Sequence, residues 1–179
     1  LREIIETMAE GGVLSTGTLS LQSLDQSTLD TIHRSNIKVE KYDDLALEFE
    51  KHDLPLVIEL MMGLPGATMD SFLGDLQQCI DREVHARVHP TEVLMNSPMN
   101  ESGYRSENEI EIVRPLSQDW TEDRLTRKKA LIISTATFTR ADYEEMGRYR
   151  KLFLLSENYG VLRQISRFVR QETGTREID

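Results

Sequence analysis

Cysteine and long apolar segments are both scarce in this sequence. Its 179 residues include one cysteine, Cys79, and no apolar run approaches the roughly 20 residues that a membrane-spanning helix needs. A single thiol cannot form a disulfide within the chain, and it cannot alone assemble a cysteine-ligated zinc or iron–sulfur site. These absences exclude an internal disulfide framework, predict no membrane span, and fit a cytoplasmic location.

Positive charge is also in short supply. Acidic residues number 31 against 21 lysines and arginines, which gives a net charge of −10. This balance argues against a nucleic-acid or anionic-membrane binder, because such proteins usually present a basic face. The sequence also lacks a Gly-x-Ser-x-Gly elbow, a Walker loop and a cluster of metal ligands, so an ordinary α/β-barrel hydrolase or lyase is disfavoured.

The first half of the sequence alternates between strand and helix patterns. After a helical pattern over 1–10, the predicted strands are 18–22, 55–62 and 86–95, and the predicted helices are 25–33, 39–52 and 69–82. Asp25 and Thr68 are suited to cap two of these helices. The segment 55–62 is almost continuously apolar, as in a strand buried on both faces of a parallel sheet. This alternation predicts an α/β fold, either a barrel or an open parallel sheet.

The sequence changes character after Pro98, where we expect a boundary between residues 1–98 and a mainly helical region, 99–179. The second region predicts an edge strand and three helices, over 109–113, 120–138, 139–158 and 161–171. Thr139 and Asp142 match a capping box at the start of the second of these helices.

The last predicted helix is amphipathic. Leu162, Ile165 and Val169 recur at helical spacing, and we expect them to face inward. The arginines lie on the other face and are expected to be solvated: Arg163, Arg167 and Arg170.

Two polar residues lie near the carboxyl ends of the first two predicted strands. Gln22 ends the first strand, and Glu59 lies within the apolar second strand. Because helices cover the apolar outer face of such sheets, Gln22 and Glu59 are expected to face the interior, where α/β folds bind ligands. A buried carboxylate needs a cation or hydroxyl donors, and Arg34 is the nearest candidate by topology.

The order and spacing of Gln22, Arg34 and Glu59 resemble a pattern that binds S-adenosylmethionine (SAM) in radical SAM enzymes. The match is to coproporphyrinogen-oxidase-like and methylthiotransferase-like members. Neighbouring motifs agree, namely Ser-Leu-Gln-Ser at 20–23, His33-Arg34, and Gly-Leu-Pro-Gly-Ala-Thr from position 63, followed by an Asp-Ser-Phe helix. The resemblance covers residues 1–98 and implies the C-terminal half of a partial TIM-like (βα)6 barrel, with three parallel strands.

The resemblance implies that these polar residues position SAM and that none acts as an acid or base. Glu59 and the Gln22 amide oxygen would accept hydrogen bonds from the ribose hydroxyls. The Arg34 guanidinium would hold the SAM carboxylate through two parallel hydrogen bonds.

An adenine contact is expected just beyond Glu59. Backbone groups of Met61 and Met62 could read the edge of the adenine ring, and Gly63 would let the backbone approach that ring closely. The methionine side chains themselves are better explained as core filling.

The implied chemistry requires a [4Fe–4S] cluster on three cysteines, which reduces SAM to methionine and a 5′-deoxyadenosyl radical. The tail after residue 99 resembles radical SAM proteins that carry a cobalamin-binding domain, in which a methyl group can pass through the corrinoid to a small-molecule substrate. This chain has no CxxxCxxC motif and begins at Leu1 inside a helical pattern. We therefore expect a fragment of a radical SAM enzyme that is inactive alone.

A half barrel leaves open sheet edges. We expect these edges to pair with the missing N-terminal half of the barrel. In the fragment alone, we expect self-association or the C-terminal helices to cover them. The alternative is a non-enzymatic α/β interaction module in which Arg34 and Glu59 form a structural bridge.

Overall fold

The computed structural model describes residues 2–13, 16–36, 39–52, 54–114 and 130–178. The strands are β1 (Gly17–Gln22), β2 (Leu56–Met62), β3 (His85–Pro90), β4 (Glu111–Val113) and β5 (Leu131–Ser134). The helices are α1 (Arg2–Glu10), α2 (Gln26–Thr31), α3 (Val39–Lys51), α4 (Met69–Asp81), α5 (Ser102–Glu107), α6 (Arg140–Phe153) and α7 (Arg163–Thr173), with a 3-10 turn η1 (Pro98–Asn100) and a π-helical segment η2 (Leu154–Asn158).

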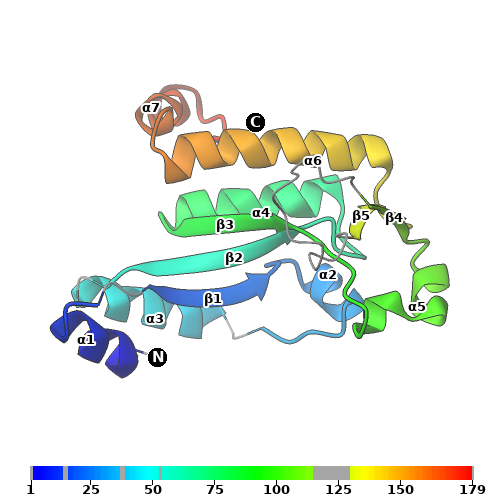
Figure 1. Cartoon of the computed structure of the whole chain (residues 1–179). Helices are drawn as coiled ribbons and strands as arrows, with labels where there is room; N and C mark the ends of the chain where they lie inside the picture. Colours follow the sequence, from blue (N-terminus) through cyan, green and yellow to red (C-terminus); the bar gives the residue numbers. More distant parts are fainter. Residues whose placement is uncertain (1, 14–15, 37–38, 53, 115–129, 179) are drawn as a thin grey trace, which may run out of the picture.

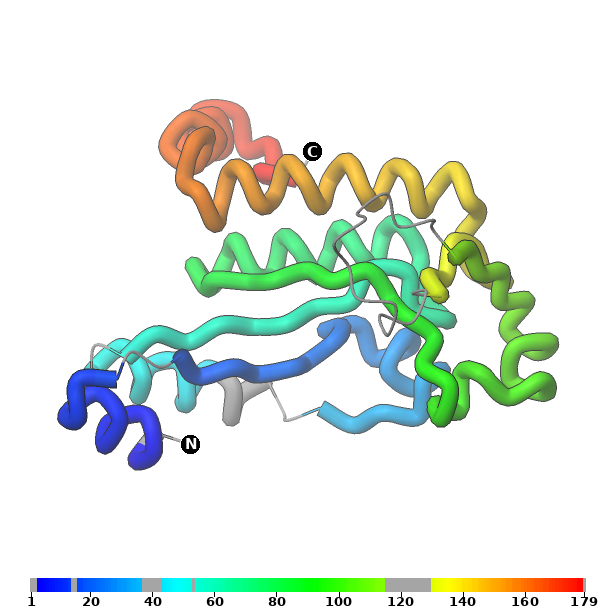
Figure 2. The backbone as a smooth tube through the Cα atoms, viewed as in Figure 1, coloured from blue at the N-terminus to red at the C-terminus, as the bar shows by residue number. Residues whose placement is uncertain are grey.

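The first three strands form one parallel sheet in the order β1-β2-β3. Helices α2 and α3 connect β1 to β2, and α4 connects β2 to β3, as parallel pairing requires. All three strands run toward α2 and α5, so their carboxyl ends meet at one end of the sheet (Figures 1 and 2). The predicted α/β fold with three parallel strands is confirmed, and the described residues form an open sheet rather than a closed barrel.

The two faces of the sheet differ in burial, as the sequence pattern predicts. Along β2, Ile58, Leu60 and Met62 are buried, whereas Glu59 and Met61 between them are half-buried. The buried set belongs to one hydrophobic core that also includes apolar side chains of α4: Phe72, Leu76 and Ile80. The opposite face therefore carries the polar side chains and is free of the main core.

Caps fix the starts of three helices at the predicted residues. The Asp25 carboxylate accepts a hydrogen bond from the backbone N–H of Thr28 at 2.8 Å, which begins α2. Thr68 begins α4 with a capping box, and Thr139 begins α6 with another, whose partner is Asp142. These bonds satisfy backbone donors that the first turn of a helix leaves unpaired.

The outer edge of β3 is closed by side chains from the C-terminal region. Arg150 Nε of α6 donates to the Val88 carbonyl at 2.6 Å, and Asn158 Nδ2 of η2 donates to the Ala86 carbonyl at 2.9 Å. Figure 1 shows α6 running alongside α4 and β3. The expectation that C-terminal helices cover an open edge is therefore met at β3. Ile132 and Met146 belong to the same hydrophobic core as the sheet, so residues from both predicted regions contribute to one core. The boundary at residue 98 stays a prediction.

Two predicted elements differ in the structure. Part of the predicted helix 120–138 lies outside the described residues, and Leu131–Ser134 forms β5, antiparallel to β4. The third strand ends at Pro90 rather than at residue 95, because the chain then leaves β3 to bond elsewhere. Val93 N donates to the Ala130 carbonyl at 2.7 Å, next to the start of β5.

The orientation predicted for the last helix is wrong. Its apolar residues Leu162, Ile165 and Val169 are exposed, with Ile165 at 62%. Its arginines instead bind carboxylates on the body of the protein, with Arg167 contacting Glu157 and Glu177 and Arg170 contacting Asp81 and Glu177. An acidic surface beside α7 therefore attracts the basic face. Among the described residues, no helix combines the length and the apolarity that crossing a membrane requires.

Candidate functional site

Polar side chains gather on the open face of the sheet around Glu59. Ser20 Oγ of β1 donates to Glu59 Oε2 at 2.6 Å, and His89 Nε2 of β3 lies 3.9 Å from Glu59 Oε1. Arg87 is the register partner of Glu59 on β3. The Glu59 side chain is partly exposed, so a ligand on this face can reach it. Glu59 lies on the face opposite the hydrophobic core, as the strand alternation predicts, while its place in a barrel interior stays a prediction. The sequence analysis did not identify Ser20 or His89 as its neighbours.

Gln22 has a backbone conformation that is unusual for a residue with a side chain. Its φ is +67°, and Ser23 N donates to the Leu21 carbonyl at 2.9 Å, so the chain makes a tight γ-turn at Gln22. The register of β1 against β2 also shifts between Ser20 and Gln22. In the described part of the chain the Gln22 side chain makes no hydrogen bond, and it is only half-buried. A strained turn thus presents a free amide at the end of β1.

Arg34 lies beside β1 but does not pair with Glu59. Its Nη2 donates to the Ser20 carbonyl, and its Nε donates to Asn36 Oδ1 at 3.2 Å. The structural Arg34–Glu59 bridge of the alternative hypothesis is therefore absent among the described residues. The reason is that the segment after α2 folds back along β1, which turns the guanidinium toward the Ser20 carbonyl and the Asn36 side chain. These bonds use two of the five guanidinium N–H donors, so both N–H groups of Nη1 and one of Nη2 remain for a carboxylate.

Asn36 is a site residue that the sequence analysis missed. Its Nδ2 donates to the Leu21 and Ser23 carbonyls, each at 2.8 Å. These two acceptors flank Gln22, so one amide holds both sides of the turn. A lone asparagine in a polar loop carries no sequence signal for this role, because the role depends on tertiary contacts.

The residues predicted to contact adenine continue from β2 into the next turn. The Met62 carbonyl accepts bonds from Thr91 N and Thr91 Oγ1, both at 2.9 Å, whereas Met61 lies half-buried on the same face as Glu59. Gly63 has φ of +82°, and an added Cβ would lie 3.2 Å from the ring of Tyr143. The backbone conformation therefore favours glycine here, and the tyrosine ring would have to shift slightly to admit a side chain. The adenine contacts remain a prediction.

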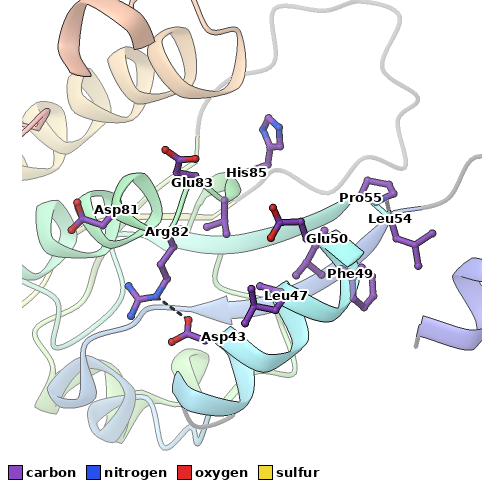
Figure 3. A pocket seen from close by; sticks show the side chains of 13 residues that line it. Asp43, Leu47, Phe49, Glu50, Leu54, Pro55, Asp81, Arg82, Glu83 and His85 are labelled. Atoms are coloured by element: carbon purple, nitrogen blue, oxygen red, sulfur yellow. Dashed lines mark hydrogen bonds and ion pairs between the residues drawn. The ribbon is translucent and has the colours of Figure 1, made fainter. Parts of the chain in front are cut away.

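A large pocket lies at the opposite end of the sheet (Figure 3). It is lined by α3, by the end of α4 and by the amino ends of β2 and β3, and an ion pair between Arg82 and Asp43 crosses part of it at 3.3 Å. Ligands of parallel α/β folds bind at the carboxyl ends of the strands, so we do not assign this pocket to SAM. The candidate site is the open face around Glu59 and Gln22.

The described residues include no group of three or more histidine, cysteine, aspartate or glutamate side chains that could hold a metal ion. The single cysteine, Cys79, is buried in α4, and burial raises its pKa to about 12. The donor set of the candidate site is made of oxygen and nitrogen groups suited to hydroxyls and carboxylates. The arrangement can therefore orient a polar organic ligand.

Comparison with known proteins supports the predicted resemblance, although no family model matches the chain. The chain is 26% identical over 181 aligned residues, or 96% of its length, to the cobalamin-dependent radical SAM methyltransferase TokK of Streptomyces tokunonensis. It is 32% identical over 55% of its length to 2-(S-pantetheinyl)-carbapenam-3-carboxylate methyltransferase of Streptantibioticus cattleyicolor. The chain spans 26% of the first relative and 15% of the second. The predicted resemblance to radical SAM enzymes is confirmed, and the proteins found are methyltransferases.

Proposed function

We propose that this chain supplies SAM-positioning residues to the active site of a cobalamin-dependent radical SAM methyltransferase. Two observations carry the proposal: a Gln22 amide at the end of β1, without a hydrogen-bond partner among the described residues, and a partly exposed Glu59 carboxylate in the middle of the neighbouring strand β2. Similarity to a radical SAM methyltransferase along nearly the whole chain supports the same assignment.

The donors and acceptors of the site fit SAM. The Glu59 carboxylate accepts a hydroxyl hydrogen bond from Ser20, which is the kind of bond that a ribose hydroxyl would make. No described residue bonds to the Gln22 amide oxygen, so it can accept another. The Nη1 atom of Arg34 has no partner in the described structure, so it can take one oxygen of the SAM carboxylate without disturbing the loop.

The redox and methyl-carrying groups would be bound by parts of the full-length protein beyond these residues. When bound, a [4Fe–4S] cluster would supply the electron that cleaves SAM, and the corrinoid would carry a methyl group to a small-molecule substrate. The residues of this chain would bind and orient SAM and exclude water from one side of the site. Because one cysteine cannot hold the cluster, we propose that the 179-residue chain alone is inactive.

The β1 edge is the surface that would meet the missing half of the barrel. β1 is the outer strand of the described sheet on the side away from β3, and no other described strand pairs with it there. We propose that a strand from the N-terminal half pairs with this edge and buries the open face around Glu59. Self-association of the isolated chain through the same edge is the corresponding proposal for the fragment.

The proposal is tested by replacing Glu59 in the full-length protein, purified with its cluster under anaerobic conditions. Glu59→Gln keeps the shape of the side chain but removes the charge that strengthens its hydrogen bonds. We expect SAM affinity, measured by equilibrium dialysis, to fall about tenfold or more, because hydrogen bonds to charged groups contribute about 1.5–3 kcal/mol.

Glu144→Gln is the matched control, because Glu144 is exposed on α6 and pairs with Arg140 of the same helix. This variant should bind SAM as the wild type does. Equal SAM affinity in wild-type and Glu59→Gln proteins would contradict the proposed role of Glu59. Failure of the folded wild-type protein to bind or cleave SAM would overturn the proposed function as a whole.

A further inference from the structure

A buried carboxylate of α4 reaches through to the turn that carries Gln22. Asp75 is 4% exposed, although it is charged in its usual state. Its Oδ2 accepts a bond from Ser23 Oγ at 2.7 Å, and its Oδ1 accepts a bond from Leu24 N at 3.0 Å. Both carboxylate oxygens therefore bind the residues that follow Gln22, about 50 positions earlier in the chain.

This placement of Asp75 is costly for the fold. Within the described residues no cation pairs with Asp75, and burial raises its pKa to about 6 even though the bonds from Ser23 and Leu24 act in the opposite direction. The negative charge of Asp25 raises it further. An apolar residue on the same face of α4 would avoid this cost, so the fold keeps a polar group where packing alone does not require one.

The contacts of Asp75 hold the residues that follow Gln22, and those of Asn36 hold the carbonyls on both sides of it. Ser23 Oγ, which binds Asp75, also accepts a bond from Asp25 N at 3.1 Å. On the other side, Asn36 holds the Leu21 and Ser23 carbonyls. A non-glycine residue with positive φ is strained and persists only when its surroundings determine its conformation. Asp75 and Asn36 together supply such surroundings, one from α4 and the other from the loop after α2.

We propose that Asp75 is a positioning residue: it fixes the Gln22 turn and thereby sets the affinity for SAM without touching SAM. The proposal rests on the proposed function for its ligand. The anchoring of the turn itself is independent of SAM and can be measured without it.

The first measurement is hydrogen exchange of the full-length protein without SAM. The backbone amide of Leu24 donates to Asp75 Oδ1, and that of Asp25 donates to Ser23 Oγ. In Asp75→Ala we expect both amides to exchange at least tenfold faster than in the wild type. Gln77→Ala is the matched control, because Gln77 is on the same helix, is 5% exposed, and donates two side-chain bonds, to Asp81 and Glu177. It should leave exchange in the turn unchanged.

The second measurement is SAM affinity in the same variants. We expect Asp75→Ala to bind SAM at least tenfold more weakly, and Gln77→Ala to stay within twofold of the wild type. If Asp75→Ala does not fold, Asp75→Asn replaces it, since its amide oxygen can still accept from Leu24 N while its amide nitrogen donates to Ser23 Oγ. We expect this variant to lie between the wild type and Ser23→Ala in affinity.

The outcomes separate the two proposals. Unchanged exchange at Leu24 and Asp25 in a folded Asp75→Ala variant would overturn the anchoring role. Faster exchange with unchanged SAM affinity would overturn the positioning role and leave Asp75 as a structural anchor. If the wild-type protein does not bind SAM, the proposed function fails, and the exchange comparison alone decides whether Asp75 anchors the turn.

Discussion

Replacing Asp75 with asparagine should change how the stability of the protein depends on pH. Burial raises the pKa of Asp75 from 3.8 to about 6 in the folded protein. A folded state with the higher pKa binds the proton more tightly than the unfolded state does. The stability contributed by protonated Asp75 is therefore fully present below about pH 3.8 and is lost as pH rises through about 6.

The size of the effect follows from the shift. One pKa unit corresponds to about 1.36 kcal/mol, so a shift of roughly two units corresponds to about 3 kcal/mol in all, of which roughly 2 kcal/mol is lost between pH 4 and pH 8. Asparagine does not titrate. The free energy of unfolding of the wild type minus that of Asp75→Asn should therefore fall by roughly 2 kcal/mol across this range.

Urea denaturation of the 179-residue chain, followed by circular dichroism at several pH values, measures this difference. Cys79, the other titratable residue of this helix with a large shift, has its pKa raised to about 12 and stays neutral throughout. Asp142 offers a flat control, because bonds from Thr139 lower its pKa below the usual 3.8, so the contribution that Asp142→Asn removes is lost only below about pH 4 and stays nearly constant from pH 4 to pH 8. If the wild-type and Asp75→Asn curves ran parallel from pH 4 to pH 8, the assignment of a buried, cation-free carboxylate would be refuted.

Two further predictions concern the turn after β2 and the edge of β3. Gly66→Ala should lower the free energy of unfolding by about 2 kcal/mol or more, because Gly66 has φ of +85° and an added Cβ would lie 2.4 Å from Thr31 Oγ1. Gly74→Ala, in open space within α4, should instead raise it by up to about 1 kcal/mol, and urea denaturation distinguishes the two. Arg150→Met removes the donor that binds a β3 carbonyl at 2.6 Å and should cost about 1–3 kcal/mol in the same assay. Arg148→Met, whose partner is one turn away on the same helix, should cost less than 1 kcal/mol, and equal costs for the two arginines would show that capping of β3 contributes nothing.

The sheet could be predicted because its pattern is local. The residues of β2 alternate between the core and the open face, and the side-chain period of a strand places Glu59 and Met61 together without knowledge of the fold. The caps at Thr68 and Thr139 are equally local, since a capping box joins residues three apart.

The missed features depend on contacts between distant segments. The segment that forms β5 is a short apolar run, Ala130-Leu-Ile-Ile, and periodicity cannot tell such a run from buried helix, although its β-branched residues favour a strand. Topology makes Arg34 a candidate partner for Glu59, yet its guanidinium donates to the Ser20 carbonyl and to Asn36 Oδ1. Asp75 gave no signal, because a single acidic residue in a helix is usually exposed.

The attachment of α7 has a consequence for how the molecule opens. None of the described side chains of this helix is buried, and it is held to the rest of the protein through its arginines, with its apolar residues facing water. Removing such a helix exposes little new apolar surface and breaks a small set of ion pairs, several of which solvent and salt can replace. Local opening of a protein begins where burial is least. We therefore expect α7 to detach well before the sheet loosens, leaving the β3 edge and its caps on α6 and η2 intact.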